Sequence, residues 1–327
     1  MPVISYIDAV TQALMEEMKR DPRVFVLGED VGVRGGVFRA TAGLIEEFGE
    51  DRVLDTPLTE SAIAGVAIGA AAYGMRPVAE MQFADFIMPA VNQIISEAAK
   101  IRYRSNGDWQ CPLVIRAPYG GGVHGALYHS QSVEKIFTGV PGLKIVMPSN
   151  PYDVKGLLKA AIRDEDPVLF FEHKRCYRLI KGEVPVEDYT VPIGKADVKR
   201  EGTDVTVISY GLTLHFALQA AEQLAQEGIS VHVLDLRTLV PLDKEAILEA
   251  VSKTGKVLVV HEDNKTGGFG GEVASIIAEE AFFELDAPVK RLCGPDVPAM
   301  PYSPPLEKEF MLNPDKIAAA IRELAEF

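Results

Sequence analysis

The chain has 327 residues, of which 47% are hydrophobic and 24% are charged, a balance typical of soluble globular enzymes and not of disordered chains. This length is enough for two ordinary domains. A formal net charge of -14 repels phosphate backbones, so we expect no nucleic-acid partner. The three cysteines are odd in number and form no Cys-x-x-Cys pair, so neither a disulfide framework nor a zinc site is indicated.

The N-terminal residues predict a helix and no targeting segment. Ser5 and Asp8 have the spacing of a capping box, and the helix that they open is expected to run to Arg20. The longest apolar run, residues 62–75, is too short and too rich in glycine and alanine to span a bilayer. We therefore expect a cytoplasmic protein with reduced thiols and no membrane partner.

Short β-branched runs alternate with helical patterns through the first half of the chain. Strands are predicted at 24–28, 76–81, 112–116, 144–147 and 167–171. Helices are predicted at 60–73, 86–104 and 151–163, the last opened by Asn150 as cap and Pro151 in the first turn. Such alternation predicts a mainly parallel sheet with helices on both faces.

The alternation lapses over residues 173–200, which are polar, and then starts again. Further strands are predicted at 205–211, 231–236, 256–260 and 289–292. A proline-rich stretch, 295–305, is expected to run extended over the surface before a last helix at 314–327. The sequence thus predicts an α/β protein of two doubly wound, mainly parallel-sheet domains, 1–185 and 200–327.

A stretch from Asp55 to Gly69 predicts a strand end, a turn and a helix that begins with an acid. In the simplest interpretation Thr59 caps this helix and Glu60 complements its dipole. Gly65 and Gly69, however, leave one face of the helix nearly without side chains. Because glycine costs about 1 kcal/mol relative to alanine in a helix, two on one face indicate that another backbone must come close.

The spacing of Glu60, Gly65 and Gly69 is similar to the pyrimidine-side motif of the transketolase-like thiamine diphosphate enzymes. Residues 80–86 and the run Gly120-Gly-Gly-Val-His-Gly-Ala-Leu-Tyr-His-Ser-Gln-Ser132 resemble the beta subunits of branched-chain 2-oxo acid dehydrogenases. The resemblance extends over essentially the whole chain. It implies a transketolase-like pyrimidine-binding domain followed by a transketolase C-terminal-like domain.

The resemblance also implies a cofactor site. Glu60 would hold N1′ of the aminopyrimidine ring of thiamine diphosphate and control its proton, while Phe86 would stack on the ring. Leu58 and Gln82 would complete the ring pocket through backbone and side-chain contacts. The cofactor would supply the decarboxylation chemistry, and the protein its position and proton control.

Two histidines and one further acid are candidates for catalysis. A histidine in a glycine-rich loop is more often structural, but the resemblance assigns His129 to the transfer of the acyl group onto the lipoyl arm. His124 is a weaker candidate. Glu29 matches an acid on a chain of carboxylates that links two active sites in related enzymes, and a solvated loop acid is an equally good interpretation.

Some expected motifs are absent. The chain has no Gly-Asp-Gly, the motif through which thiamine enzymes hold the diphosphate by Mg²⁺. The family solution is an alpha subunit that holds Mg²⁺ in an α2β2 assembly. The run 267–271 lacks the last glycine of a dinucleotide fingerprint, since Val273 stands there, and is read as a loop into a helix. Asp164 and Asp166, with the backbone near Leu113, match a monovalent-cation (K⁺) site in some relatives.

The resemblance implies the function of the beta subunit of a thiamine-diphosphate-dependent enzyme of the 3-methyl-2-oxobutanoate dehydrogenase type. It would decarboxylate branched-chain 2-oxo acids and pass the acyl group to the lipoyl arm of an acyltransferase core. Pyruvate or acetoin as substrate, and a non-catalytic scaffold subunit, are the alternatives.

Overall fold

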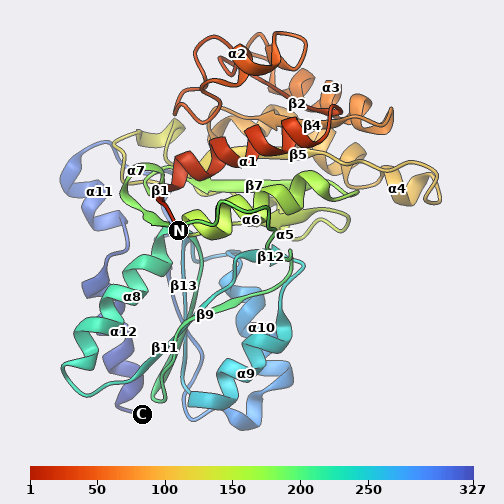
Figure 1. The fold of residues 1–327 in the computed structure, drawn as a ribbon. Helices are drawn as coiled ribbons and strands as arrows, with labels where there is room; N and C mark the ends of the chain where they lie inside the picture. The colour runs from red at the N-terminus through yellow and green to blue at the C-terminus, as the bar shows by residue number, and fades with distance from the viewer. The chain divides into compact units, whose positions relative to one another are not determined.

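The computed structural model describes residues 1–327, which form two compact units (Figure 1). The first unit comprises Met1–Tyr119 and Ile136–Ile193, and the second comprises Gly120–Lys135 and Gly194–Phe327. We call the segment Gly120–Lys135 the histidine loop. It lies inside the range 1–185 of the predicted first domain, but it groups with the second unit.

Six strands of the first unit form a parallel sheet in the order β6-β7-β5-β4-β2-β3. Their bounds are β2 Val24–Gly28, β3 Val53–Asp55, β4 Arg76–Glu80, β5 Val114–Tyr119, β6 Lys144–Val146 and β7 Val168–His173. The apolar runs that predict strands are buried here, as expected where helices cover both faces of a parallel sheet. The predicted fold class is confirmed.

The helices and the remaining strands of the first unit surround this sheet. They are β1 Val3–Ser5, α1 Tyr6–Arg20, α2 Leu44–Phe48, α3 Glu60–Ala72, η1 Ala84–Ala90, η2 Gln93–Ala98, α4 Ile101–Arg104, α6 Pro151–Arg163, α7 Cys176–Leu179 and β8 Lys181–Glu183. The short helix α5, Lys135–Thr138, follows the histidine loop. The capping box of Ser5 and Asp8 opens α1, and Asn150 caps α6, both as predicted.

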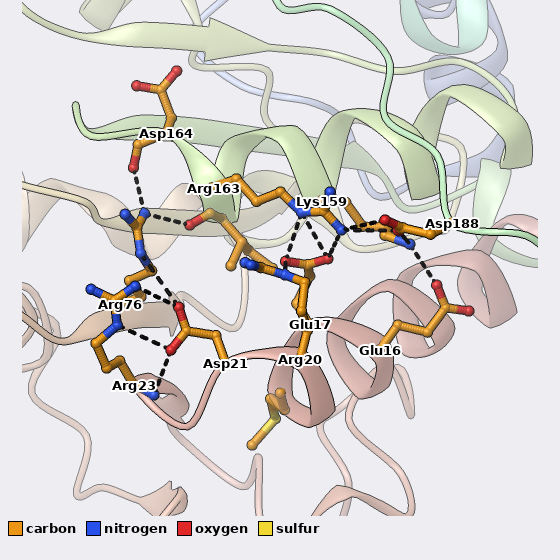
Figure 2. A network of polar contacts seen from close by, with 12 residues as sticks. Glu16, Glu17, Arg20, Asp21, Arg23, Arg76, Lys159, Arg163, Asp164 and Asp188 are labelled. Carbon is orange, nitrogen blue, oxygen red and sulfur yellow. Dashed lines mark hydrogen bonds and ion pairs between the residues drawn. The ribbon is translucent and has the colours of Figure 1, made fainter.

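Ion pairs join α1 to α6, as Figure 2 shows. The carboxylate of Glu17 accepts a hydrogen bond of 2.6 Å from Arg163, and Glu16 lies 2.7 Å from the buried ammonium of Lys159. Asp188, in the polar stretch 173–200, pairs with both Lys159 and Arg163. The hydrogen bonds from these two side chains lower the pKa of Asp188 to about 2. Buried charges are tolerated here because each one has a partner.

The single helix predicted at 86–104 is wrong. A 3₁₀ helix, η1, is followed by a one-turn π-helical segment, η2, and then by the short helix α4. Pro89 lies inside η1. It has no N–H to donate and its ring clashes with the carbonyl four residues earlier, so a continuous α-helix cannot run through it.

The second unit is built on a five-stranded sheet in the order β14-β13-β10-β11-β9, parallel except for the edge strand β9. The five strands are β9 Asp197–Arg200, β10 Val205–Ser209, β11 Val231–Asp235, β13 Val257–Asn264 and β14 Lys290–Gly294, and the short strand β12, Thr238–Val240, lies outside this sheet. The helices are η3 Ala126–Tyr128, α8 Gly211–Ala225, α9 Lys244–Thr254, α10 Gly270–Glu280, η4 Phe282–Glu284, α11 Pro304–Phe310 and α12 Pro314–Ala325.

Two elements of the second unit differ from the expectation. β9 lies at the end of the stretch 173–200, where no strand is predicted, and α11 begins at Pro304 in what is expected to be an extended segment. The sheet packs against α8 and α12 through a continuous buried cluster of aliphatic side chains. None of the helices combines the length and the apolar character that are needed to cross a bilayer.

Candidate active site

Three neighbouring parallel strands bring the predicted cofactor residues to one edge of the first sheet. β2 pairs with β3 on one side and with β4 on the other, and Gly28 is in register with both Asp55 and Glu80, the last residues of those two strands. Segments that follow these three strands must therefore leave the sheet side by side. They carry the candidate residues Glu29, Leu58, Glu60, Gln82 and Phe86. The carboxyl edge of a parallel sheet is where α/β proteins bind ligands.

Glu60 is the first residue of α3 and is half-buried. Thr59 precedes it as the cap residue but makes no side-chain capping bond, so the simple capping interpretation is not supported. The first turn of α3 thus leaves its N–H groups without a hydroxyl partner from Thr59. A carboxylate at this position is favoured by the helix dipole and can act as a proton donor or acceptor.

Glu29 lies close enough to Glu60 for the two charges to interact. Its side chain is 4% exposed, and neither carboxylate oxygen has a hydrogen-bond partner. Burial raises the pKa of Glu29 and the charge of Glu60 raises it further, while the nearby backbone N–H of Thr59 opposes the shift. An unpartnered buried acid is costly, so it is typical of a functional site and not of a solvated loop.

Gln82 and Phe86 follow β4. The Gln82 amide donates a hydrogen bond of 3.3 Å to Asp30, which follows β2. Phe86 packs edge-on against Phe83, with ring centroids 5.7 Å apart. Leu58 is 81% exposed, although it is a large apolar side chain. The four predicted cofactor residues therefore share one edge of the sheet, and Leu58 offers apolar surface there to whatever covers it.

A buried ion-pair network lies in the strands behind this edge. Arg116 on β5 donates hydrogen bonds of 2.6 and 2.7 Å to Glu172 on β7 and one of 2.5 Å to Glu80 on β4, and Tyr177 donates one of 2.6 Å to Glu172. Burial raises the pKa of Glu80, while the charge of Arg116 opposes the shift. Removing one partner of such a network costs about 3–5 kcal/mol. The network ties β4, and hence Gln82, to its neighbours.

The histidine loop belongs to the second unit, and His129 follows its single 3₁₀ turn, η3. The turn is tight: a Cβ atom at Gly125 would lie 2.7 Å from the carbonyl oxygen and 2.8 Å from the Cβ of His129. His129 is half-buried. The Nδ1 atom of His124 lies 2.5 Å from the carboxylate of Glu307 of α11, so this side chain is held by α11.

The predicted monovalent-cation residues already have partners. Both carboxylate oxygens of Asp164 accept hydrogen bonds of 2.6 and 2.7 Å from Lys144, and Asp166 accepts one of 3.0 Å from Arg102. The Leu113 carbonyl accepts the N–H of Val168 at 2.8 Å. A carbonyl or carboxylate oxygen that accepts one hydrogen bond keeps further lone pairs, so a monovalent cation at these residues stays a prediction.

The exposed face of α3 is open. No atom lies within 4 Å of a Cβ added at Gly69, and a Cβ at Gly65 would meet only Gln93, at 3.9 Å. Val66 is 58% exposed and Tyr73 is 93% exposed. The chain itself provides no backbone that packs on these glycines, which leaves the face free for another chain.

Comparison with known proteins identifies the family. Residues 3–180 match the family described as transketolase, pyrimidine binding domain, and residues 194–317 match transketolase, C-terminal domain. The chain is 77% identical to the 2-oxoisovalerate dehydrogenase subunit beta of Bacillus subtilis (strain 168), over 327 residues and the full length of both. The chain belongs to the 2-oxo acid dehydrogenase beta subunits.

Other members and a solved structure agree with this assignment. The beta subunit of pyruvate dehydrogenase from the same Bacillus strain is 48% identical over the full length of both chains. A solved structure described as a split gene transketolase, inactive beta4 tetramer, matches with a TM-score of 0.80 and 25% identity, over 99% of this chain and 98% of the other. Membership of this transketolase-like family implies thiamine diphosphate as cofactor and an alpha subunit as partner.

Sequence reasoning missed the residues that support the site. They are Arg116, Glu172, Glu262 and Glu307. A charged residue inside an apolar strand run, such as Arg116 at the end of the predicted strand 112–116, is a usable signal because a buried charge needs a partner. Glu307 gives no such signal, because nothing local marks it as buried.

Proposed function

We propose that this chain, together with an alpha subunit, decarboxylates branched-chain 2-oxo acids. The observation that carries the proposal is the gathering of Glu60, Gln82 and Phe86 beside the unpartnered acid Glu29 at one sheet edge, in a 2-oxo acid dehydrogenase beta subunit. The branched-chain preference is supported by the 77% identity to the 2-oxoisovalerate enzyme's subunit, compared with 48% for the pyruvate enzyme's.

The residues at this edge fit the aminopyrimidine half of thiamine diphosphate. Glu60 would hold and exchange the proton at N1′, Phe86 would lie against the ring, and Gln82 and the backbone at Leu58 would fix its edge. When bound, thiamine diphosphate supplies the electron sink for decarboxylation. Glu29, buried and protonated more readily than an ordinary acid, would keep a proton near Glu60.

His129 would act in the second half of the reaction. We assign it to the transfer of the acyl group to a lipoyl arm, in which the sulfur that leaves the opening dithiolane ring needs a proton. Imidazole can give and take protons near neutral pH. This role is supported by the resemblance of the loop and by the half-buried position of His129 after η3.

The chain requires partners for this chemistry. Because it has no Gly-Asp-Gly motif, we propose that the alpha subunit of an α2β2 assembly holds Mg²⁺ and the diphosphate. The acyl acceptor would be a lipoyl acyltransferase core. The three free cysteines support a cytoplasmic location. A K⁺ site at Leu113, Asp164 and Asp166 remains part of the proposal, because the hydrogen bonds that these oxygens accept leave lone pairs for a cation.

The test is to purify the chain with an alpha subunit and to measure, with an artificial electron acceptor, the decarboxylation of 3-methyl-2-oxobutanoate and of pyruvate and the oxidative cleavage of acetoin. We expect kcat/KM for 3-methyl-2-oxobutanoate to exceed that for pyruvate at least tenfold. A higher kcat/KM for pyruvate or acetoin would contradict the branched-chain assignment. No turnover of any substrate by a complex that binds thiamine diphosphate would favour a scaffold role.

A further inference from the structure

The histidine loop adopts a backbone that needs support from outside. His124 and Ala126 have φ values of 56° and 53°, in the left-handed region that side chains other than glycine rarely adopt. Gly121 packs so closely on the second unit that a Cβ there would lie 2.3 Å from the Cε of Met300. A strained loop keeps its shape only where its surroundings hold it.

One oxygen of Glu262 holds both ends of this loop. Glu262 lies on β13 and is 6% exposed. Its Oε1 accepts a hydrogen bond of 2.6 Å from the backbone N–H of Gly121 and one of 3.3 Å from the hydroxyl of Ser132. His129 lies between these two donors in the sequence, so a single buried carboxylate binds the chain on both sides of His129. Hydrogen bonds to a carboxylate are shorter and stronger than those between neutral groups.

Glu307 holds the middle of the same loop. It lies on α11, is 4% exposed, and receives both the backbone N–H of His124 at 3.1 Å and the ring Nδ1 at 2.5 Å. The strained residue His124 is thus fixed at two atoms by one carboxylate. Glu262 and Glu307 together support the loop before and after its turn.

We propose that Glu262 is a positioning residue for His129, and that Glu307 assists it through His124. The two acids would act on acyl transfer by fixing the loop and would not touch the substrate. The proposal rests on the transfer role of His129 given above. Misplacing a catalytic group by about 1 Å can cost on the order of 10²-fold in rate, so loss of these anchors should be visible in the transfer step.

The experiment uses the complete complex with its alpha subunit and compares Glu262→Ala, Glu262→Gln and Glu307→Ala. Two rates are measured: reductive acylation of a lipoyl domain, and decarboxylation with an artificial acceptor. Amide hydrogen exchange of residues 121–132 reports the loop directly. We expect Glu262→Ala to speed this exchange at least tenfold and to lower acylation roughly tenfold more than decarboxylation, with a smaller shift for Glu307→Ala.

Glu262→Gln should restore both readouts to within about threefold of the native enzyme, because an amide oxygen can still accept both donors. The matched control is Glu309→Ala, since Glu309 is exposed on the same helix as Glu307. If Glu262→Ala fails to assemble, Ser132→Ala, which removes one donor only, gives the same comparison on a smaller scale.

Unchanged exchange in Glu262→Ala, or in Ser132→Ala where that variant replaces it, would overturn the proposal. Faster exchange without a change in the acylation-to-decarboxylation ratio would also overturn it, provided that His129→Ala does change the ratio. If His129→Ala leaves the ratio unchanged, the transfer role is wrong, and the exchange data alone decide whether Glu262 anchors the loop.

Discussion

Glu60 combines three properties that a proton-exchanging acid needs: a helix N-terminus, partial burial and a second acid nearby. We predict that Glu60→Gln assembles normally but loses decarboxylation by about 10²–10⁴-fold, because an amide cannot exchange a proton with the aminopyrimidine ring. Decarboxylation with an artificial acceptor measures the loss. Glu272→Gln, an exposed acid in the first turn of α10, is the control. A loss below about threefold in Glu60→Gln would remove this acid from the mechanism.

His129 should matter more for one half of the reaction than for the other. His129→Ala is expected to lower acylation of a lipoyl domain at least tenfold more than decarboxylation, because only the transfer step needs its proton. Both rates are measured on the same preparation of the complex. Equal losses in the two assays would show that His129 only orders its loop.

Glu134, at the end of the histidine loop, is the residue from which a pH dependence of stability is expected. It is fully buried beside Asp263, Glu262 and Lys135, and it accepts a hydrogen bond of 2.9 Å from Tyr210. Burial raises the pKa of Glu134 well above its usual range, with the charge of Asp263 next in importance. The folded state therefore holds a proton that the unfolded state releases, and stability from this group falls as the pH rises above about 4.5.

The side chain introduced by Glu134→Gln cannot ionise, but its amide oxygen can still accept the hydrogen bond from the Tyr210 hydroxyl. We predict that the free energy of unfolding of this variant, relative to the native chain, rises between pH 5 and pH 8 by on the order of 1 kcal/mol or more. Urea unfolding at both pH values measures the difference. The same difference at pH 5 and pH 8 would mean that Glu134 does not retain its proton in the folded chain.

At the scale of elements, the exposed stripe of α3 is the clearest candidate for contact with another chain. Gly69→Leu should weaken assembly with the alpha subunit or with a second beta subunit while the beta chain stays folded, because the added side chain points into space that is open within this chain. Sedimentation of the complex and thermal unfolding of the beta chain separate the two effects. Ala278→Leu on the exposed side of α10 is the control. An intact assembly in Gly69→Leu would place the interface elsewhere.

Elements with local start signals could be predicted closely from the sequence. α1 begins after its Ser5 capping box, α6 begins after Asn150 with Pro151 in its first turn, and β2 covers the predicted residues 24–28. In each case the signal lies within a few residues of the element that it defines. The edge that gathers Glu60, Gln82 and Phe86 also follows from strand order, once the parallel sheet is assumed.

Elements and contacts that depend on distant residues could not be predicted. The helical pattern over 86–104 forms three short pieces, of which only the first contains Pro89. β9 pairs with β11 at the edge of its sheet. The two carboxylates that hold the histidine loop are even more distant in the sequence from the residues they contact. Glu262 lies 141 residues from Gly121, and Glu307 lies 183 residues from His124. No local pattern encodes such a pairing.

At the scale of the whole molecule, the proposal is that this chain supplies one half of the cofactor site and the alpha subunit the other. It carries a formal charge of -14 and no Gly-Asp-Gly motif for a magnesium diphosphate. We predict that the beta chain alone neither decarboxylates 2-oxo acids nor binds thiamine diphosphate with Kd below about 1 mM, and that the alpha subunit restores both. Calorimetric titration with and without alpha, in the presence of Mg²⁺, measures this. Turnover by the isolated chain would contradict a two-chain site.

The grouping of the histidine loop with the second unit also has a consequence for synthesis on the ribosome. The loop is made early, but the carboxylates that fix it are made late. At about 5–20 residues per second, Glu262 follows Gly121 by roughly 7–28 s and Glu307 follows His124 by roughly 9–37 s. For that time the loop is a glycine-rich tether between β5 and α5, open to proteases and to chaperones. The strands of the first unit can already pair while the histidine loop still waits for the rest of the second unit to be made.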